Sequence, residues 1–179
     1  MSRSLAVQSQ LAINRNLSLE DRGRMQDYAN RVAYAESKGD PQAVQKSRRG
    51  GTGPGRGAFQ FEMKAGGGSG GGKTAANRLM AFAKQYSVDL KLSDDERAML
   101  ESDDPDFSKL PYDIQEAALF ANANYHPKFP LSDLATGKLD MGDAYRLYHY
   151  AGPEVERIKK HWADSSEAYD ARRRSRGQP

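Results

Sequence analysis

Apolar residues recur at three- and four-residue steps in several windows of the sequence, and this spacing constrains the fold more than any other feature. The first window has clear ends. Ser18 can cap a helix, with Asp21 three residues later as its capping-box partner, and Gly39 ends the helix. Strand-like apolar runs are almost absent after Thr74. The pattern therefore predicts a mainly helical protein.

Later windows add further helices and one extended element. Phe59, Phe61 and Met63 alternate with polar residues, which predicts a short strand or extended segment. The later helical signals are the apolar positions Ala75, Leu79, Phe82 and Tyr86, the capping pair Ser93 and Glu96, the windows 112–124 and 140–150, and a last helix opened by Gly152 and Pro153 with Val155, Ile158 and Trp162 on its inner face. We therefore expect a mainly α fold of the α+β kind. It would be a helical single domain with a small extended or β element between the first and second helices.

The composition excludes several kinds of site. The 179-residue chain has no cysteine, so neither a disulfide framework nor a thiolate metal site can form. His126, His149 and His161 are far apart in sequence and show no metal-ligand spacing. We therefore expect no metal and no cofactor. No apolar run reaches the roughly 18 residues of a membrane-spanning helix, so we expect no membrane span.

The two ends differ from the middle of the chain. Residues 1–16 lack the apolar stretch of a signal peptide, so we expect a mobile segment there and synthesis in a cytoplasm without a signal peptide. We place the domain at 17–170 and a basic tail at 171–179. The basic residues of this tail are Arg172, Arg173, Arg174 and Arg176. They carry much of the net charge of +3, which suits an anionic partner, but we interpret the tail itself as solvated and frayed.

Glu36 is the candidate catalytic residue. Met25, Tyr28 and Val32 define the apolar face of the first helix, and Glu36 continues their spacing into the last turn. A buried position and the negative end of a helix both favour the neutral form of a carboxyl group. A protonated carboxylic acid is what glycosidic bond cleavage requires, because the leaving oxygen must receive a proton. On this pattern alone, pairing with an arginine is the more common fate of an inward-facing acid.

Two further features favour a sugar substrate. The glycine-rich loop 52–61 allows a backbone to approach a ligand closely, and Gln60 offers an amide that can bond sugar hydroxyls. The segment 148–153 places aromatic side chains at a corner between two helices, where they suit a sugar ring. Taken singly, each is more simply a turn or a packed corner. Their combination with Glu36 is more specific.

These residues resemble the pattern of the soluble-type lytic transglycosylases in the goose-type-lysozyme-like superfamily. That pattern has a Glu-Ser pair closing a helix, a small-residue segment, Gly-x-x-Gln, and later a Tyr-Asn-Ala-Gly-Pro corner. The corresponding residues here are Glu36-Ser37, the segment 40–44, Gly57-Ala58-Phe59-Gln60, and Tyr150-Ala151-Gly152-Pro153. The resemblance covers roughly residues 27–162. Its central part is most similar to phage versions of the domain.

The resemblance implies a lysozyme-like fold and a peptidoglycan lytic transglycosylase. Such an enzyme cleaves the MurNAc-GlcNAc β-1,4 bond with a single catalytic Glu and leaves 1,6-anhydroMurNAc ends. Glu36 would act first as acid and then as base, supported by Ser37, with Gln60 beside the cleaved bond. The residues expected to bind substrate are Ser37, Gln60, Phe61, Glu62, Tyr148, His149 and Tyr150. The tyrosine that bonds the acid in that family could correspond to any of the last three.

The phage resemblance also implies where the protein acts. Phage versions of the domain are components of the virion or tail and open the bacterial cell wall during genome entry. We therefore expect peptidoglycan glycan strands as substrate, other virion or tail proteins as partners, and action on the host's periplasmic cell wall. An endolysin is the alternative delivery route. We expect no specific nucleic-acid binding, because zinc spacing and a recognition helix are both missing from the sequence.

Three other functions stay open. A hydrolytic lysozyme would need a second carboxylate, and Glu62 is the candidate because it would share a face with Gln60 in an extended segment. Residues 67–74 satisfy the phosphate-loop pattern G-x-x-x-x-G-K-[ST], which would bind a nucleotide. That fold needs several parallel strands, which the sequence does not indicate. The third alternative is a binding or structural module without catalysis.

Overall fold

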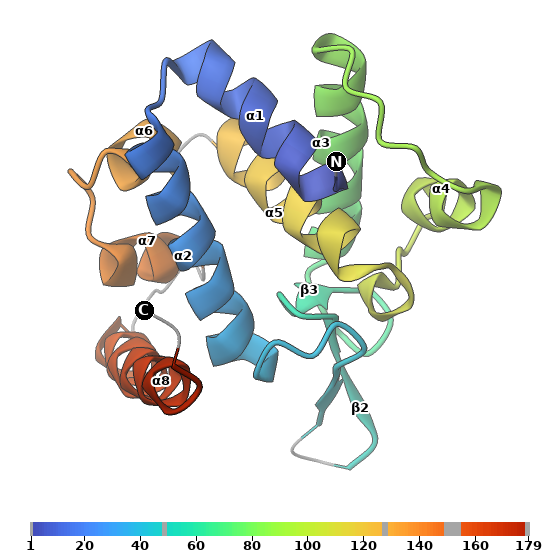
Figure 1. Cartoon of the computed structure of the whole chain (residues 1–179). Coiled ribbons are helices and arrows are strands. Elements are labelled where there is room, and N and C mark those ends of the chain that lie inside the picture. Colours follow the sequence, from blue (N-terminus) through green and yellow to red (C-terminus); the bar gives the residue numbers. More distant parts are fainter. Residues whose placement is uncertain (1, 48–49, 127–128, 149–154, 178–179) are drawn as a thin grey trace.

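The computed structural model describes residues 2–47, 50–126, 129–148 and 155–177 and is mostly helical (Figure 1). Helices make up 64% of it, which confirms the prediction of a mainly α protein. The α-helices are α1 (Arg3–Arg15), α2 (Leu19–Ser37), α3 (Gly71–Gln85), α4 (Asp94–Glu101), α5 (Tyr112–Tyr125), α6 (Leu131–Ala135), α7 (Met141–Tyr148) and α8 (Val155–Ser175). A short 3-10 turn, η1 (Phe107–Lys109), precedes α5.

Two of the helix starts form as the sequence predicts. The Ser18 side chain accepts a hydrogen bond from the backbone of Asp21, and the Asp21 carboxylate accepts from the backbone of Ser18. Ser93 and Glu96 make the same reciprocal pair at the start of α4. Each box satisfies two backbone N–H groups that have no partner within the helix. The boundaries of α2 and α4 therefore follow from local chemistry.

Helix α1 corrects the expected limits of the domain. The segment 1–16, which we expected to be mobile, holds this helix, and its Val7 and Leu11 are fully buried. They lie four residues apart and so share the face that packs along α5. Arg3 adds ion pairs to Asp113 and Glu96, both at 3.1 Å. The N-terminal segment is thus part of the core.

The small sheet joins α2 to α3. Its antiparallel strands are β1 (Val44–Lys46), β2 (Thr52–Arg56) and β3 (Phe61–Glu62), in that order. Arg56 pairs with Phe61, so the four residues between them form a tight turn. The extended segment is therefore shorter than predicted, because Phe59 and Gln60 belong to the turn. The hairpin formed by β1 and β2 projects beyond the end of α2, away from the helices (Figure 1).

The C-terminal helix packs across α2. Trp162 is buried, whereas Val155 and Ile158 of the predicted inner face are only half-buried. Arg31 of α2 holds Asp170 of α8 with two hydrogen bonds, at 2.8 and 3.2 Å. Helix α8 reaches Ser175, so the first part of the predicted basic tail continues the helix. In the described part of the chain, every helix is too short or too polar to cross a membrane.

Candidate active site

Glu36 lies where the sequence placed it, in the last turn of α2, and it is half-buried. Its Oε1 accepts a hydrogen bond of 2.5 Å from the hydroxyl of Tyr145, on α7. The ring of Tyr145 packs against that of Trp162 on α8, with the two ring centroids 4.8 Å apart. The carboxylate is therefore positioned by a neutral donor from a distant helix.

Two further tyrosines are affected by this carboxylate. Burial raises the pKa of the hydroxyls of Tyr28, Tyr145 and Tyr148, and the charge on Glu36 raises each of them further. All three phenols therefore stay protonated over the working pH range and can act as hydrogen-bond donors. These three described tyrosines are thus neutral groups on which the charge of Glu36 acts.

The Tyr28 hydroxyl is buried and has no hydrogen-bond partner within the described residues. Tyr28 and Tyr148 border a cavity of about 50 Å³ together with Asn122 and Phe129. That volume is enough for one water molecule, which occupies about 30 Å³ in the liquid. A water here would satisfy the Tyr28 hydroxyl, which otherwise loses the hydrogen bonds it had in solvent.

Ser37 connects the end of α2 to the hairpin turn. Its hydroxyl donates to the carbonyl oxygens of Ala58, at 2.9 Å, and Ala33, at 3.1 Å. The Tyr148 hydroxyl donates to the carbonyl oxygen of the next turn residue, Phe59, at 2.7 Å. The turn is thereby tied both to the helix that carries Glu36 and to α7. These hydrogen bonds give Ser37 and Tyr148 a positioning role.

Gln115, on α5, holds the turn of residues 57–60 in place. This side chain is fully buried, and its Oε1 accepts from the Ala58 backbone at 2.7 Å. Its Nε2 donates to the carbonyl oxygens of Pro41, at 2.9 Å, and Leu110, at 2.7 Å. At Gly57, which has a φ of +76°, an added Cβ would lie 2.3 Å from the same Oε1. The glycine of the Gly-x-x-Gln pattern is thus required by both its backbone angle and its contact with Gln115.

Gln60 folds back over its own turn. Its φ is +50°, and its Nε2 donates to the carbonyl oxygen of Gly57 at 2.8 Å. Because Gln60 is in the left-handed region and not in a strand, it does not share a strand face with Glu62 as we expected. Its Oε1 lies close above Gly55, where a Cβ would come within 2.4 Å. Gln60 is half-buried at the end of the turn.

Phe61 and Glu62 are placed differently from one another. Phe61 is only 5% exposed and packs on Phe107 with a ring-centroid distance of 4.3 Å, which argues against the substrate contact that we expected. Glu62 is half-buried, and its Oε2 accepts from the backbone of Ser69 at 2.9 Å. Burial and the charge on Glu36 raise the pKa of Tyr148 most, and the charge on Glu62 adds a smaller effect in the same direction. Glu62 therefore lies on the same side of the molecule as the tyrosine cluster.

Among the described residues, the tyrosine that bonds the acid is Tyr145, which the sequence analysis did not consider. Of the three positions considered for this role, Tyr148 bonds the turn, while His149 and Tyr150 lie outside the described residues, as does the Ala-Gly-Pro corner. The helical signal could have identified Tyr145, because it stands three residues before Tyr148 on the same face of the predicted helix.

The surroundings of the glycine loop differ from those of a phosphate loop. The sheet is antiparallel, and the phosphate-loop fold requires parallel strands. Lys73 Nζ donates to the carbonyl oxygens of Glu101, at 2.8 Å, and Ser102, at 2.6 Å, at the end of α4. Its ammonium group is thus used to cap a helix C-terminus. Among the described residues, no cluster of three His, Asp or Glu side chains could hold a metal ion.

Comparison of the chain with protein-family models, curated proteins and solved structures gave no match.

Proposed function

We propose that this protein is a lysozyme-like peptidoglycan lytic transglycosylase with Glu36 as its catalytic acid and base. The observation that carries the proposal is the 2.5 Å hydrogen bond from Tyr145 to Glu36 Oε1, beside the turn that ends in Gln60. An arginine at this position would hold the carboxylate ionised. A neutral phenol brings no positive charge to the carboxylate, and its hydrogen bond stabilises the anion formed after the proton is given up.

The reaction follows from this arrangement. Glu36 protonates the glycosidic oxygen between MurNAc and GlcNAc, the C–O bond breaks, and an oxocarbenium-like or acetamido-bridged species forms at the MurNAc anomeric carbon. Glu36, now anionic and bonded by Tyr145, takes the proton of the 6-hydroxyl of the same sugar. That oxygen closes onto the anomeric carbon and gives the 1,6-anhydro ring. An intramolecular nucleophile has an advantage of proximity over water.

Hydrolysis is the second candidate, because Glu62 lies on the side of the tyrosine cluster. A second carboxylate could activate a water or attack the sugar. The backbone N–H of Ser69 already bonds one oxygen of Glu62, which favours its role as an anchor for the glycine loop. We therefore place Glu62 outside the chemistry.

The products separate the two reactions. Incubation with purified peptidoglycan should release fragments with 1,6-anhydroMurNAc ends, identified by mass, and Glu62→Gln should retain most of the activity. Reducing MurNAc ends as the main product, lost in Glu62→Gln, would instead identify a two-carboxylate hydrolase. A protein that releases neither fragment would be a binding or structural module.

Tyr145→Phe should lower kcat by roughly 10- to 150-fold with little change in KM, measured on soluble, uncrosslinked glycan strands. The estimate is the value of a hydrogen bond to a charged group, about 1.5–3 kcal/mol. The phenylalanine ring keeps the contact with Trp162. Tyr125→Phe is the matched control, because its hydroxyl bonds Gln85 at an exposed site. Equal activity of Tyr145→Phe and the control would remove Tyr145 from the site.

The proposed setting is a phage virion or tail, from which the enzyme would reach the host's periplasmic cell wall during genome entry. This proposal is supported by the resemblance of the Glu36 to Gln60 region to phage versions of the domain. Other virion or tail proteins would then be its partners. Mass spectrometry of purified virions would test this placement.

A further inference from the structure

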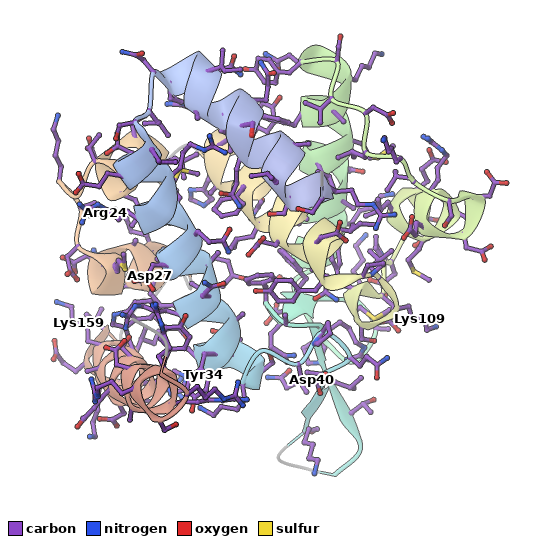
Figure 2. The ribbon with its side chains drawn as sticks, in the orientation of Figure 1. Arg24, Asp27, Tyr34, Asp40, Lys109 and Lys159 are labelled. Carbon is purple, nitrogen blue, oxygen red and sulfur yellow. The ribbon has the colours of Figure 1, made fainter. Side chains whose placement is uncertain are left out.

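A basic pocket lies beside α2, and Glu36 is not among the residues that line it. Its volume is about 310 Å³, and it forms where the ends of α2 and α8 meet the start of α5. Figure 2 shows Tyr34 where α2 and the C-terminal part of α8 meet. The described residues that line this basic pocket are Asn30, Ala33, Tyr34, Lys38, Gly39, Tyr112, Tyr169, Arg172, Arg173 and Arg176.

The net charge of the basic pocket is positive. Four of the described lining residues are cationic, and none is an aspartate or glutamate. Arg173 is partly neutralised by Asp27 at 3.5 Å. Lys38, Arg172 and Arg176 have no ion-pair partner within the part of the chain that the structure describes. Basic residues in the last turn of a helix do complement its dipole. That effect does not explain why cations from two helices converge on one hollow.

The aromatic rings of the pocket contact three of its four cations. Lys38 Nζ lies 4.5 Å from the ring centroid of Tyr34, and Arg172 Cζ lies 5.9 Å from the same centroid. Arg173 Cζ lies 5.8 Å from the ring centroid of Tyr169. Such contacts are favourable by about 0.5–1 kcal/mol at exposed sites. The cations are therefore partly ordered before any ligand arrives, which lowers the entropy cost of binding.

These features distinguish between anionic ligands. Guanidinium groups match the oxygens of a phosphate in pairs, so several of them favour phosphate over a single carboxylate. A nucleobase would have to displace cations from the tyrosine faces on which it stacks. The volume is at the lower end of small-molecule sites, about 300 Å³, and exceeds what a bare phosphate fills. Asn30, whose Oδ1 already accepts from Gln26, keeps its amide N–H groups for a hydroxyl.

We propose that the basic pocket binds a polyol phosphate, the repeating unit of polyol-phosphate polymers. The phosphate lies among Lys38, Arg172 and Arg176, and the polyol hydroxyls face Asn30. This site takes a different ligand from the candidate active site and does not depend on the lytic activity. It assigns a role to arginines that the sequence alone marked as a frayed tail.

The test is calorimetric titration of the full chain at low ionic strength with glycerol 3-phosphate, inorganic phosphate and the oligonucleotide dT6. The pocket variants are the double substitution Arg172→Gln with Arg176→Gln, and Lys38→Asn. Asparagine tolerates the φ of +61° at that position, so this variant should fold. The matched control for the double substitution is Arg174→Gln with Lys138→Gln. It removes the same two positive charges at exposed positions that do not line the pocket. Melting temperatures check that each variant is folded.

We expect one-to-one binding of glycerol 3-phosphate, tighter than that of inorganic phosphate, and at least tenfold weaker in both pocket variants but not in the control. Glu36→Gln should bind it as well as the wild type, which keeps this result separate from the proposed activity. Absent binding, or equal weakening in the control, would overturn the proposal. Tighter binding of dT6, lost in the pocket variants, would make this a nucleic-acid site and overturn the assignment to a polyol phosphate.

Discussion

Replacing Glu36 with glutamine should remove nearly all lytic activity and leave the protein folded. Glutamine keeps the shape of the side chain, and its amide oxygen can still accept the hydroxyl of Tyr145. It cannot donate the proton that the leaving oxygen needs or take the proton of the 6-hydroxyl. General acid–base catalysis typically supplies about 10²–10⁴-fold in rate, and in the proposed mechanism one group serves both steps. The measurement is the rate of release of soluble fragments from peptidoglycan.

Glu20→Gln is the control for this substitution, because it makes the same chemical change in the exposed first turn of the same helix. It should leave the rate unchanged. Circular dichroism and the melting temperature should agree among the three proteins. A folded Glu36→Gln protein with near-normal activity would show that the catalytic acid is elsewhere.

Leu11→Ala should have the second large effect, on stability. Leu11 is fully buried where α1 packs along α5. Truncation of a buried leucine to alanine costs about 2–5 kcal/mol of unfolding free energy, and whole domains are stable by only about 5–15 kcal/mol. The variant should therefore lose a large part of its stability in urea denaturation. A mobile N-terminal segment would predict no loss.

Ile13→Ala is the matched control, since Ile13 is on the same helix but is 74% exposed. Its unfolding free energy should change by no more than about 0.5 kcal/mol. If Leu11→Ala and Ile13→Ala lowered the unfolding free energy by the same small amount, α1 would contribute little to the folded domain. That result would support the prediction of a mobile N-terminal segment.

The contrast between α1 and α2 shows what local sequence can predict. Helix α2 has a capping box at Ser18 and a glycine just after its end, so its limits could be read directly. Helix α1 has a capping serine, Ser2, and apolar residues at 5–7 and 11–13, but it has neither a capping box nor a glycine after its end. Its stability comes from burial against α5, more than 100 residues later, and propensity alone does not report such a partner.

The candidate site was predictable to a similar extent. The four-residue spacing of Glu36 from Val32 correctly predicted that Glu36 lies in the last turn of a helix, on the side of its apolar face. The alternation around Phe59 predicted more strand than forms, because the positive φ of Gln60 is set by the turn and not by side-chain pattern. Helical spacing places Tyr145 and Tyr148 on one face of α7, but it does not say which of the two reaches Glu36 on α2.

The hydrogen bond between Tyr145 and Glu36 joins two positions that are 109 residues apart in the chain. During synthesis, α2 leaves the ribosome long before α7, so a nascent chain carries the carboxylate without its hydroxyl partner. Closing so long a loop costs chain entropy that local contacts do not repay. Competence to cleave would therefore arise late in biogenesis, and a nascent chain or proteolytic fragment that stops before α7 would lack it.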